Sequence, residues 1–298
     1  MRRRGSASMA ALMLAPFTSL FVLFTLVPIL SAVALGFFSF DMINPPRFVG
    51  FENYVRMLVD DSVFPIAVRN TLVFAFLTGP LGYVLSFLFA WLINELRPRI
   101  RAWLTLLFYA PTLAGNVFFL WLFLFSGDAY GLVNSTLMQL GLIQEPVQWL
   151  TDSRYSLGVV VLVMLWLSMG AGFLAIIAGF QGLSRELYEA AAVDGIRNRW
   201  QELWYVTLPQ MAPQMLFAAV ISIATSFAVG YQSMELTGFP STDYATHTLT
   251  LHILDIGGIR FEMGYASALA FVLFAMMAVT WRGIETLFRR LAEGKGGK

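Results

Sequence analysis

Residues 5–40 read GSASMAALMLAPFTSLFVLFTLVPILSAVALGFFSF and include no charged side chain. A helix needs about 20 mostly apolar residues to cross a bilayer, so this stretch is long enough for a span. Arginines precede it, as in a signal peptide, but the apolar part of a cleaved signal covers only about 7–15 residues. The stretch therefore predicts an uncleaved transmembrane helix over residues 12–38.

The composition of the whole chain agrees with a membrane protein. The 298 residues are 58% hydrophobic and only 12% charged, whereas soluble domains carry about 25% charged residues. A net charge of +1 provides no basic field for nucleic acid, so a nucleic-acid partner is not expected. The chain has no Cys and only 2 His, which excludes disulfides and thiolate metal sites. His247 and His252 are poorly spaced for one helical face, and we predict no metal site.

Five further apolar runs are long enough to span a bilayer. Because backbone groups find no water partner in hydrocarbon, each run is expected to be helical. The sequence therefore predicts an all-α integral membrane protein with six transmembrane helices within residues 12–287. The predicted spans are 12–38, 71–93, 103–125, 157–180, 213–231 and 264–287.

The distribution of Lys and Arg predicts the orientation, because cytoplasmic loops are enriched in them. With residues 1–11 as a cytoplasmic N-terminus and 288–298 as a cytoplasmic tail, 14 of the 19 basic residues lie inside. The outer loops then hold only Arg47, Arg56, Arg69, Arg154 and Arg260. Within the first outer loop, residues 50–61 have the apolar spacing of a surface helix. Residues 246–256 fit either a strand-like loop or a short helix.

The cores of the predicted spans hold almost no ionisable side chain, although such residues mark proton and ion pathways in carriers. Energy for uphill transport would therefore enter from outside the membrane. Uncharged polar and aromatic groups are present, and these suit sugar hydroxyls and pyranose faces. Hydrogen bonding between helices is the alternative role of each. The candidate substrate pathway comprises Asn116, Trp166, Ser226, Tyr231, Gln232, Ser233 and, at the outer end, Glu235.

The longest inner loop, residues 181–212, reads QGLSRELYEAAAVDGIRNRWQELWYVTLPQMA. Ser184 is a plausible N-cap with Glu186 in the first turn, and Gly195 is a natural stop. A second helix is predicted over Arg199–Thr207, with Pro209 starting the next span. A short alanine-rich helix outside the bilayer is typical of a docking element.

This loop resembles the EAA loop of ABC importer permeases. The matching residues are Glu189-Ala190-Ala191, Asp194-Gly195 and Val206-Thr207-Leu208-Pro209, with one more residue before Val206 than in the family pattern. The segments FVGFENY (48–54), RNT (69–71), LTG (236–238) and GYASA (264–268) are similar to the carbohydrate branch, of the maltose and glycerol-phosphate type. The resemblance covers nearly the whole chain.

The resemblance implies a type I importer fold, with a five-helix core plus an N-terminal helix that wraps against a second homologous permease. It implies a complex with two copies of an ABC ATPase, and that the loop docks on an ATPase subunit through Glu189, Ala190, Ala191, Asp194, Gly195, Leu208 and Pro209. It further implies an extracytoplasmic substrate-binding protein, a bacterial or archaeal plasma membrane, and a carbohydrate substrate. ATP and Mg would bind the ATPase. The Gly-Lys pair Gly294-Lys295 is not followed by the Ser or Thr of a phosphate-binding loop.

Two other classes of function remain alternatives from the residues alone. A secondary carrier or channel for a small polar solute explains six spans but leaves the alanine-rich loop unexplained. A membrane-embedded enzyme requires catalytic polar residues at membrane depth, and the sequence offers no such set.

Overall fold

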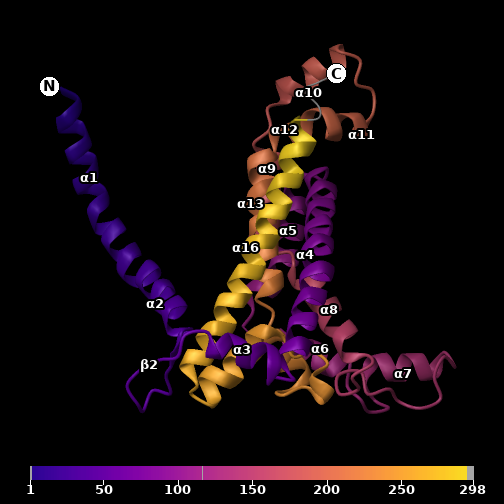
Figure 1. Cartoon of the computed structure of the whole chain (residues 1–298). Coiled ribbons are helices and arrows are strands. Elements are labelled where there is room, and N and C mark those ends of the chain that lie inside the picture. The colour runs from indigo at the N-terminus through magenta and orange to yellow at the C-terminus, as the bar shows by residue number, and fades with distance from the viewer. Residues whose placement is uncertain (1, 116, 294–298) are drawn as a thin grey trace. The chain divides into compact units, whose positions relative to one another are not determined.

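The computed structural model describes residues 2–115 and 117–293 (Figure 1). These residues are predominantly helical, as the sequence predicts. The strands of the described part are one antiparallel pair, β1 (Phe38–Ser39) and β2 (Arg47–Phe48), in which Phe38 lies opposite Phe48.

The chain divides into two compact units. The first takes in the chain up to Phe64 together with His252–Met276. The second takes in Pro65–Leu251 together with the chain from Met277.

The first unit begins with the long apolar segment that opens the sequence. α1 (Arg2–Phe21) continues through a π-helical turn at Val22–Leu26 into α2 (Val27–Leu35). Residues Leu12–Leu35 are long and apolar enough to cross a membrane, and 0% of this window is buried within the chain. Its side chains are therefore left for lipid or another polypeptide.

Short elements complete the first unit. α3 (Glu52–Val59) is the helix predicted within residues 50–61, and it buries Asn53 and Met57. The Asn53 amide donates to the backbone carbonyl of Gly36 at 2.9 Å, which fixes α3 beside the end of α2. Later in the chain, residues 246–256 prove largely helical. They form α15 (Leu249–Ile253) and the start of a π-helical turn at Leu254–Ile259. The long helix α16 (Met263–Glu293) follows, and only its part up to Met276 belongs to the first unit.

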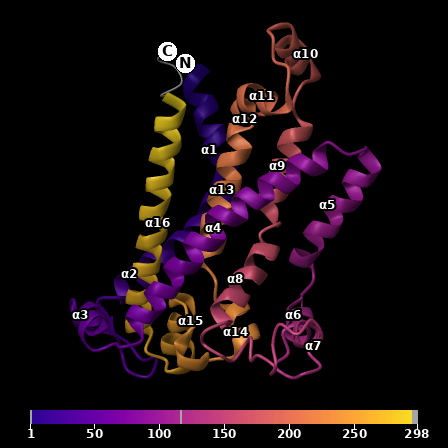
Figure 2. The same cartoon turned by 90° about the vertical axis from the view of Figure 1, so that its right-hand side faces the viewer.

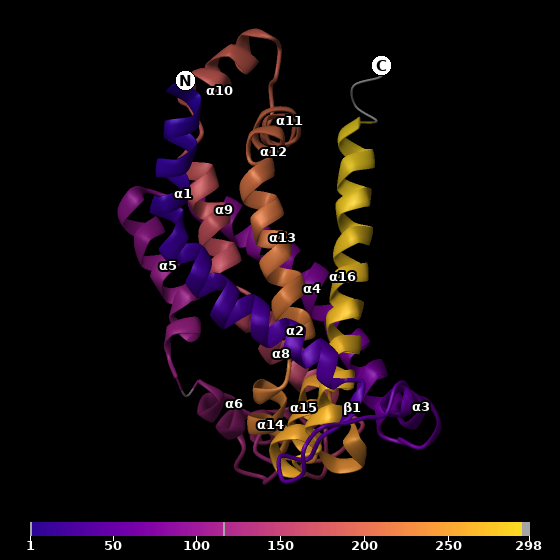
Figure 3. The same ribbon diagram turned by 60° about the vertical axis from the view of Figure 1, so that its left-hand side comes forward.

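The second unit is built from helices that pack through apolar side chains. α9 (Ala171–Gln181) and α13 (Ala212–Phe227) lie side by side (Figures 2 and 3). A Cβ at Gly172 would lie 3.4 Å from the Ala218 backbone, an ordinary van der Waals contact, so a methyl group would fit at this position without displacing α13. The other helices are α4 (Phe64–Asn94), α5 (Pro98–Leu113), α6 (Phe118–Leu124), α7 (Leu132–Gln139), α8 (Ser156–Leu167), α10 (Arg185–Val193), α11 (Arg199–Glu202), α12 (Leu208–Gln210) and α14 (Tyr231–Thr237).

Among the described residues, four helical segments are long and apolar enough to cross a membrane by themselves. Two bent helix pairs pass the same test, and the total reaches six when each pair counts as one span. The four segments are Leu12–Leu35, Phe64–Asn94, Ser156–Gln181 and Met263–Thr286.

The predicted spans 103–125 and 213–231 are not continuous helices. In the first, α5 ends at an extended backbone at Ala114 (φ −81°, ψ 118°), and α6 follows at an angle of 90°. In the second, α13 ends at Phe227, and the non-helical backbone of Gly230 (φ −156°, ψ −74°) separates it from α14. Tyr231 therefore opens a new helix.

The sequence predicts that Pro209 begins the fifth span, but the structure places it inside the preceding helical segment. The helical segment from Arg199 continues through Pro209 to Gln210, and an 80° bend separates it from Ala212–Phe227. Within the second unit, α10, α11 and α12 lie at one end, and α6, α7 and α14 lie at the opposite end (Figures 1, 2 and 3).

Asn134 organises the loop segment that flanks α7. Its side chain is 0% exposed, and its amide nitrogen donates to the backbone carbonyls of Ser126, Asp128 and Val147 at 3.0–3.1 Å. Its amide oxygen accepts from the Val147 N–H at 3.1 Å and from the Trp149 indole at 2.8 Å. One side chain thus closes the loop from residue 126 to residue 149.

Candidate functional site

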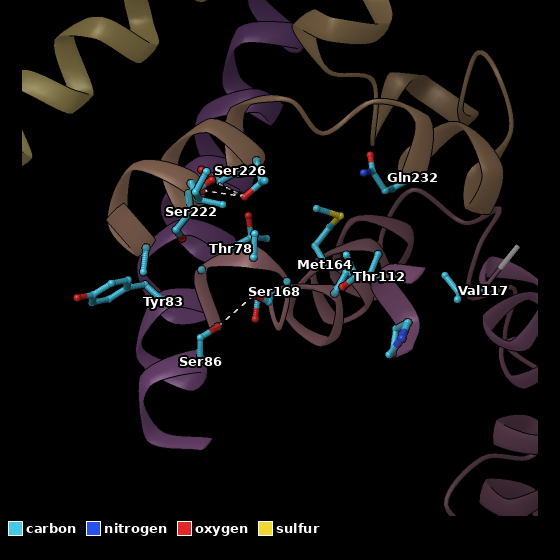
Figure 4. Close-up of a pocket in the computed structure, with 18 of the residues that line it drawn as sticks. Thr78, Tyr83, Ser86, Thr112, Val117, Met164, Ser168, Ser222, Ser226 and Gln232 are labelled. Carbon is cyan, nitrogen blue, oxygen red and sulfur yellow. Dashed lines mark hydrogen bonds between the residues drawn. The ribbon is translucent and has the colours of Figure 1, made fainter. Parts of the chain in front are cut away.

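A cavity of about 400 Å³ lies within the second unit (Figure 4). Pockets for small molecules have volumes of roughly 300–1,000 Å³, so it can hold one. α4, α8, α9 and α13 supply most of its wall. The breaks between α5 and α6 and between α8 and α9 also border it, through Ala114 and Ser168, and Gln232 enters just after the break before α14. We call this space the hydroxyl-lined cavity.

Side-chain hydroxyls from three helices and one helix break give the cavity its polar character. In Figure 4, Ser222 and Ser226 of α13 lie near Thr78 of α4, whereas Gln232 approaches from a different side. The Tyr83 hydroxyl points away from these groups (Figure 4). The hydroxyl-bearing residues of the lining are Thr78, Tyr83, Ser86, Thr112, Ser168, Ser222, Thr225 and Ser226.

Two residues of the predicted substrate pathway, Ser226 and Gln232, line the cavity. Ser226 is 3% exposed, and its hydroxyl donates to the Ile223 carbonyl at 2.9 Å. The oxygen of the Gln232 amide accepts from the Gly230 N–H at 3.3 Å.

The structure places the other described members of the predicted set outside the lining. Trp166 packs edge-to-face on Trp121, with ring centroids 5.4 Å apart. Ser233 is 0% exposed and donates to the Thr246 carbonyl at 2.8 Å, a contact within the fold. Tyr231 and Glu235 interact with each other on α14, and Tyr231 also meets Phe118 edge-to-face. Asn116 lies outside the described residues.

Thr78 and Ser86 of α4 and Thr112 of α5 line the cavity but are absent from the predicted set. Thr78 and Ser86 are eight residues apart, which places both hydroxyls on one helical face. That spacing within an apolar span is a signal the sequence offered.

The second candidate site is the exposed helix α10. Ser184 is its N-cap, as predicted, and its hydroxyl accepts from the Glu186 N–H at 3.2 Å. At the other end the Ile196 N–H donates to the Ala191 carbonyl at 3.0 Å, and Gly195 adopts φ +94°. This is the C-terminal cap that glycine favours, because a side chain strains a left-handed backbone. The helix is thus closed at both ends by local contacts.

Contacts outside α10 fix the loop to the rest of the second unit. The Tyr188 hydroxyl lies 3.0 Å from the Thr207 hydroxyl. The Arg199 guanidinium forms a salt bridge of 2.7 Å with Glu95 at the end of α4. The Trp200 ring meets Trp91 of α4 edge-to-face, with centroids 5.2 Å apart. The loop is therefore joined to α4 through α11, and α10 is joined to the later part of the same loop through Tyr188.

The structure brings five of the seven predicted docking residues together on α10 and its C-terminal turn. Glu189 has a side chain 66% exposed and pairs with Arg185 one turn earlier at 3.1 Å. Ala190, Asp194 and Gly195 are exposed, whereas Ala191 is buried at 7%. Leu208 and Pro209 lie apart from them, on α12.

A partly buried ionic cluster lies in the first unit. The Asp61 carboxylate accepts from the Tyr265 hydroxyl at 2.5 Å and contacts the His252 Nε2 at 2.7 Å. Arg56 forms an ion pair with Glu262 and lies over the Tyr265 ring at 4.3 Å. The sequence analysis did not identify these contacts. Among residues 2–115 and 117–293, no group of three or more His, Cys, Asp or Glu is arranged to hold a metal ion.

Comparison with known proteins identifies the family of the chain. A family model described as "Binding-protein-dependent transport system inner membrane component" matches residues 81–292, which is more than half of the chain. The chain is 30% identical to the lactose transport system permease protein LacF of Rhizobium radiobacter, over 90% of each chain. It is 31% identical to the arabinooligosaccharides transport system permease protein AraP of Bacillus subtilis, over 89% of this chain and 83% of that one.

A solved structure shares the fold. It is a crystal structure of a bacterial ABC transporter involved in the import of the acidic polysaccharide alginate, with a TM-score of 0.77 and 24% identity. The match covers 97% of this chain and 98% of the other. Family model, relatives and fold agree with the cavity and the exposed loop: the chain belongs to the inner membrane components of binding-protein-dependent transport systems, the ABC importer permeases.

Proposed function

We propose that this chain is one of two membrane-spanning permease subunits of an ABC importer that carries a carbohydrate, specifically an oligosaccharide, into the cytoplasm. Relatives named for lactose and arabino-oligosaccharide transport support the substrate class. The hydroxyl-lined cavity supports it chemically, because uncharged polar groups suit sugar hydroxyls.

The observation that carries the proposal is the exposed helix α10. It is closed at both ends, presents Glu189 and Ala190 outward, and contacts the Leu203–Thr207 turn of the same loop through Tyr188 and Thr207. In the proposed complex, α10 binds a cleft on the ATPase. Closure of two ATPase copies on ATP, with its Mg, would move α10 and switch the cavity from inward-facing to outward-facing.

The remaining partners follow from the same complex. A solved relative of the fold is in complex with an alginate pentasaccharide-bound periplasmic protein, and we propose that an extracytoplasmic binding protein delivers substrate to this chain too. A second homologous permease would face the exposed residues Leu12–Leu35. Both termini would lie in the cytoplasm. Ser226 and Gln232 would contact the sugar, and Asn116 and Trp166 remain candidates along its path.

Reversing one charge on α10 tests the docking role. We expect Glu189→Lys to lower substrate uptake and substrate-stimulated ATP hydrolysis at least about tenfold, because a charge-assisted contact worth roughly 1.5–3 kcal/mol would be lost. The amount of permease in the membrane should not change, since Glu189 is exposed and its pair with Arg185 contributes little to stability.

Two variants control this experiment. Glu145→Lys makes the same charge change at an exposed residue between α7 and α8 and should leave uptake unchanged. Arg185→Ala removes the ion pair within α10 but keeps Glu189. Affinity purification through a tag on this chain should recover a second permease and two ATPase copies. Full uptake by Glu189→Lys, or recovery of this chain without an ATPase, would contradict the proposal.

A further inference from the structure

Six of the eight hydroxyl-bearing residues around the cavity donate their protons to other groups of the protein. A hydroxyl carries one proton and two lone pairs, so each of these oxygens can only accept a further hydrogen bond. The donations go to backbone carbonyls and measure 2.7–3.1 Å. They are made by Thr78 to Phe74, Ser86 to Ser168, Ser168 to Leu165, Ser222 to Gly79, Thr225 to Ile221 and Ser226 to Ile223.

Gln232 is the contrasting group in the lining. Its amide oxygen accepts from the Gly230 N–H, so its NH₂ group is left as the donor. The described lining residues include no Asp, Glu, Lys, Arg or His. The described part of the cavity wall is therefore uncharged, and most of its side-chain oxygens can only accept. Its side-chain donors are the Gln232 NH₂ group and the hydroxyls of Thr112 and Tyr83, of which Tyr83 points away from the other groups (Figure 4).

From this polarity we infer that the cavity selects neutral polyhydroxyl ligands and rejects sugars that carry a carboxylate, sulfonate or phosphate. The inference rests on the proposed function and narrows its substrate class. A neutral sugar hydroxyl can donate to the wall oxygens. An anionic group has only lone pairs to offer, meets the lone pairs of the wall, and loses its hydration with no cation to compensate.

The fold does not impose this selectivity. The solved relative that imports the acidic polysaccharide alginate has the same fold with a TM-score of 0.77. The discrimination assigned to this chain instead lies in the side chains of its cavity and in the direction of their hydrogen bonds.

Binding to the native complex without its binding protein tests the inference, because that receptor would otherwise filter the ligands. The complex is isolated through a tag on this chain, placed in lipid nanodiscs, and titrated by saturation-transfer NMR. The probes are methyl β-D-glucoside, methyl β-D-glucuronide and the neutral methyl β-D-glucuronamide. We expect the glucuronide to bind at least about tenfold more weakly than both neutral probes, with the glucuronamide excluding a size effect.

A change at Thr225 should reverse the preference. Thr225 is an exposed residue of α13 in the lining, so Thr225→Lys adds a cation to the cavity wall. We expect this variant to bind the glucuronide about tenfold more tightly than the wild type does. Thr225→Val, of similar shape and without the hydroxyl, should still reject the glucuronide. Retained binding of glucoside by both variants would report intact folding.

The outcomes separate the two proposals. Equal or tighter binding of the glucuronide by the wild type would overturn the inference and leave the permease function standing. Failure of Thr225→Lys to improve glucuronide binding, with glucoside binding intact, would also overturn it. If the isolated complex binds neither neutral probe, both the carbohydrate function and the inference fail.

Discussion

Asp61 shows how one side chain can join several segments of the first unit. Its side chain is only 11% exposed, and it contacts His252 and Tyr265, which lie 191 and 204 residues later in the chain. It also caps the start of α4 by accepting from the backbone N–H of Val63 and Phe64 at 2.9 and 3.0 Å. Burial raises the pKa of Asp61, but the hydrogen bonds from Tyr265 and His252 outweigh burial and leave its pKa below the ordinary 3.8.

Replacing Asp61 by Asn should lower the melting temperature and weaken its dependence on pH. Because the folded pKa of Asp61 is depressed, its contribution is complete above about pH 5 and is lost as the pH falls through the folded pKa, below 3.8. Melting curves of the purified chain from pH 7 to pH 3 should therefore show that the melting temperature of the wild type falls more steeply with decreasing pH than that of Asp61→Asn. The exposed neighbour Asp60→Asn serves as the control. The same decrease in melting temperature between pH 7 and pH 3 for the wild type and Asp61→Asn would contradict this role.

At the same scale, the sequence predicted part of the cavity. Ser226 and Gln232 could be picked because they cluster at the end of an apolar run. Thr78 and Ser86 escaped notice, since an isolated hydroxyl in a span is most often bonded to its own helix. Thr78 does donate to its own helix, at Phe74, whereas Ser86 donates to Ser168 in the break between α8 and α9. Ser233, equally polar in sequence, contributes its hydroxyl to the fold.

Among the elements, α10 could be predicted nearly to its ends, because its signals are local. The Ser184 cap and the Gly195 stop act within a few residues of the helix they delimit. The breaks before α6, α9 and α14 could not be predicted, because hydropathy averages over a whole span and does not detect a bend inside it. Gly170 and Gly230 occupy two of the breaks, yet Gly158 sits within a continuous helix.

The three breaks share a location that explains them. Each lies beside a residue that lines the cavity: Ala114, Ser168 and Gln232. Irregular backbone at membrane depth is tolerated where it borders a cavity, since its polar groups then have partners other than lipid. The hydropathy pattern reports which residues can face the hydrocarbon. It does not report the helix breaks that shape the cavity inside the protein.

The packing of α9 on α13 should be sensitive to volume at Gly172. We expect Gly172→Val to cost about 1–3 kcal/mol, because the added methyl groups would meet the Ala218 backbone, which already lies 3.4 Å from a Cβ at this position. Thermal unfolding in detergent would measure the loss. Gly158→Val in α8 is the matched control, because a Cβ there meets nothing within 4 Å. Equal melting temperatures for the two variants would show that α9 and α13 have room to separate.

At the scale of the whole molecule, the transmembrane topology can be tested directly. The positive-inside distribution predicts both termini in the cytoplasm, residue 130 outside and residue 193 inside. Four to six helical segments of the described residues qualify as spans. Finding whether two positions lie on the same side or on opposite sides of the membrane therefore tests the predicted order of crossings.

The absence of native cysteine provides a clean test of this topology. Tyr130 and Val193 are 92% and 88% exposed, so each can be replaced by Cys without disturbing the interior. We expect Tyr130→Cys to react with a membrane-impermeant maleimide in intact spheroplasts. Val193→Cys should react only after the membrane is permeabilised. Labelling of both from the same side would rule out the predicted single crossing by α8 and α9.

The closure of residues 126–149 by Asn134 bears on how this protein can be handled in the laboratory. The Asn134 amide holds both ends of the segment. The stretch between these ends, where Leu140 and Leu142 are exposed, contributes little to holding the segment in place. An epitope inserted at Gly141 would lengthen an exposed loop whose two ends stay fixed by the hydrogen bonds of Asn134. The chain thus offers an attachment point for an antibody fragment, remote in sequence from both the cavity wall and α10.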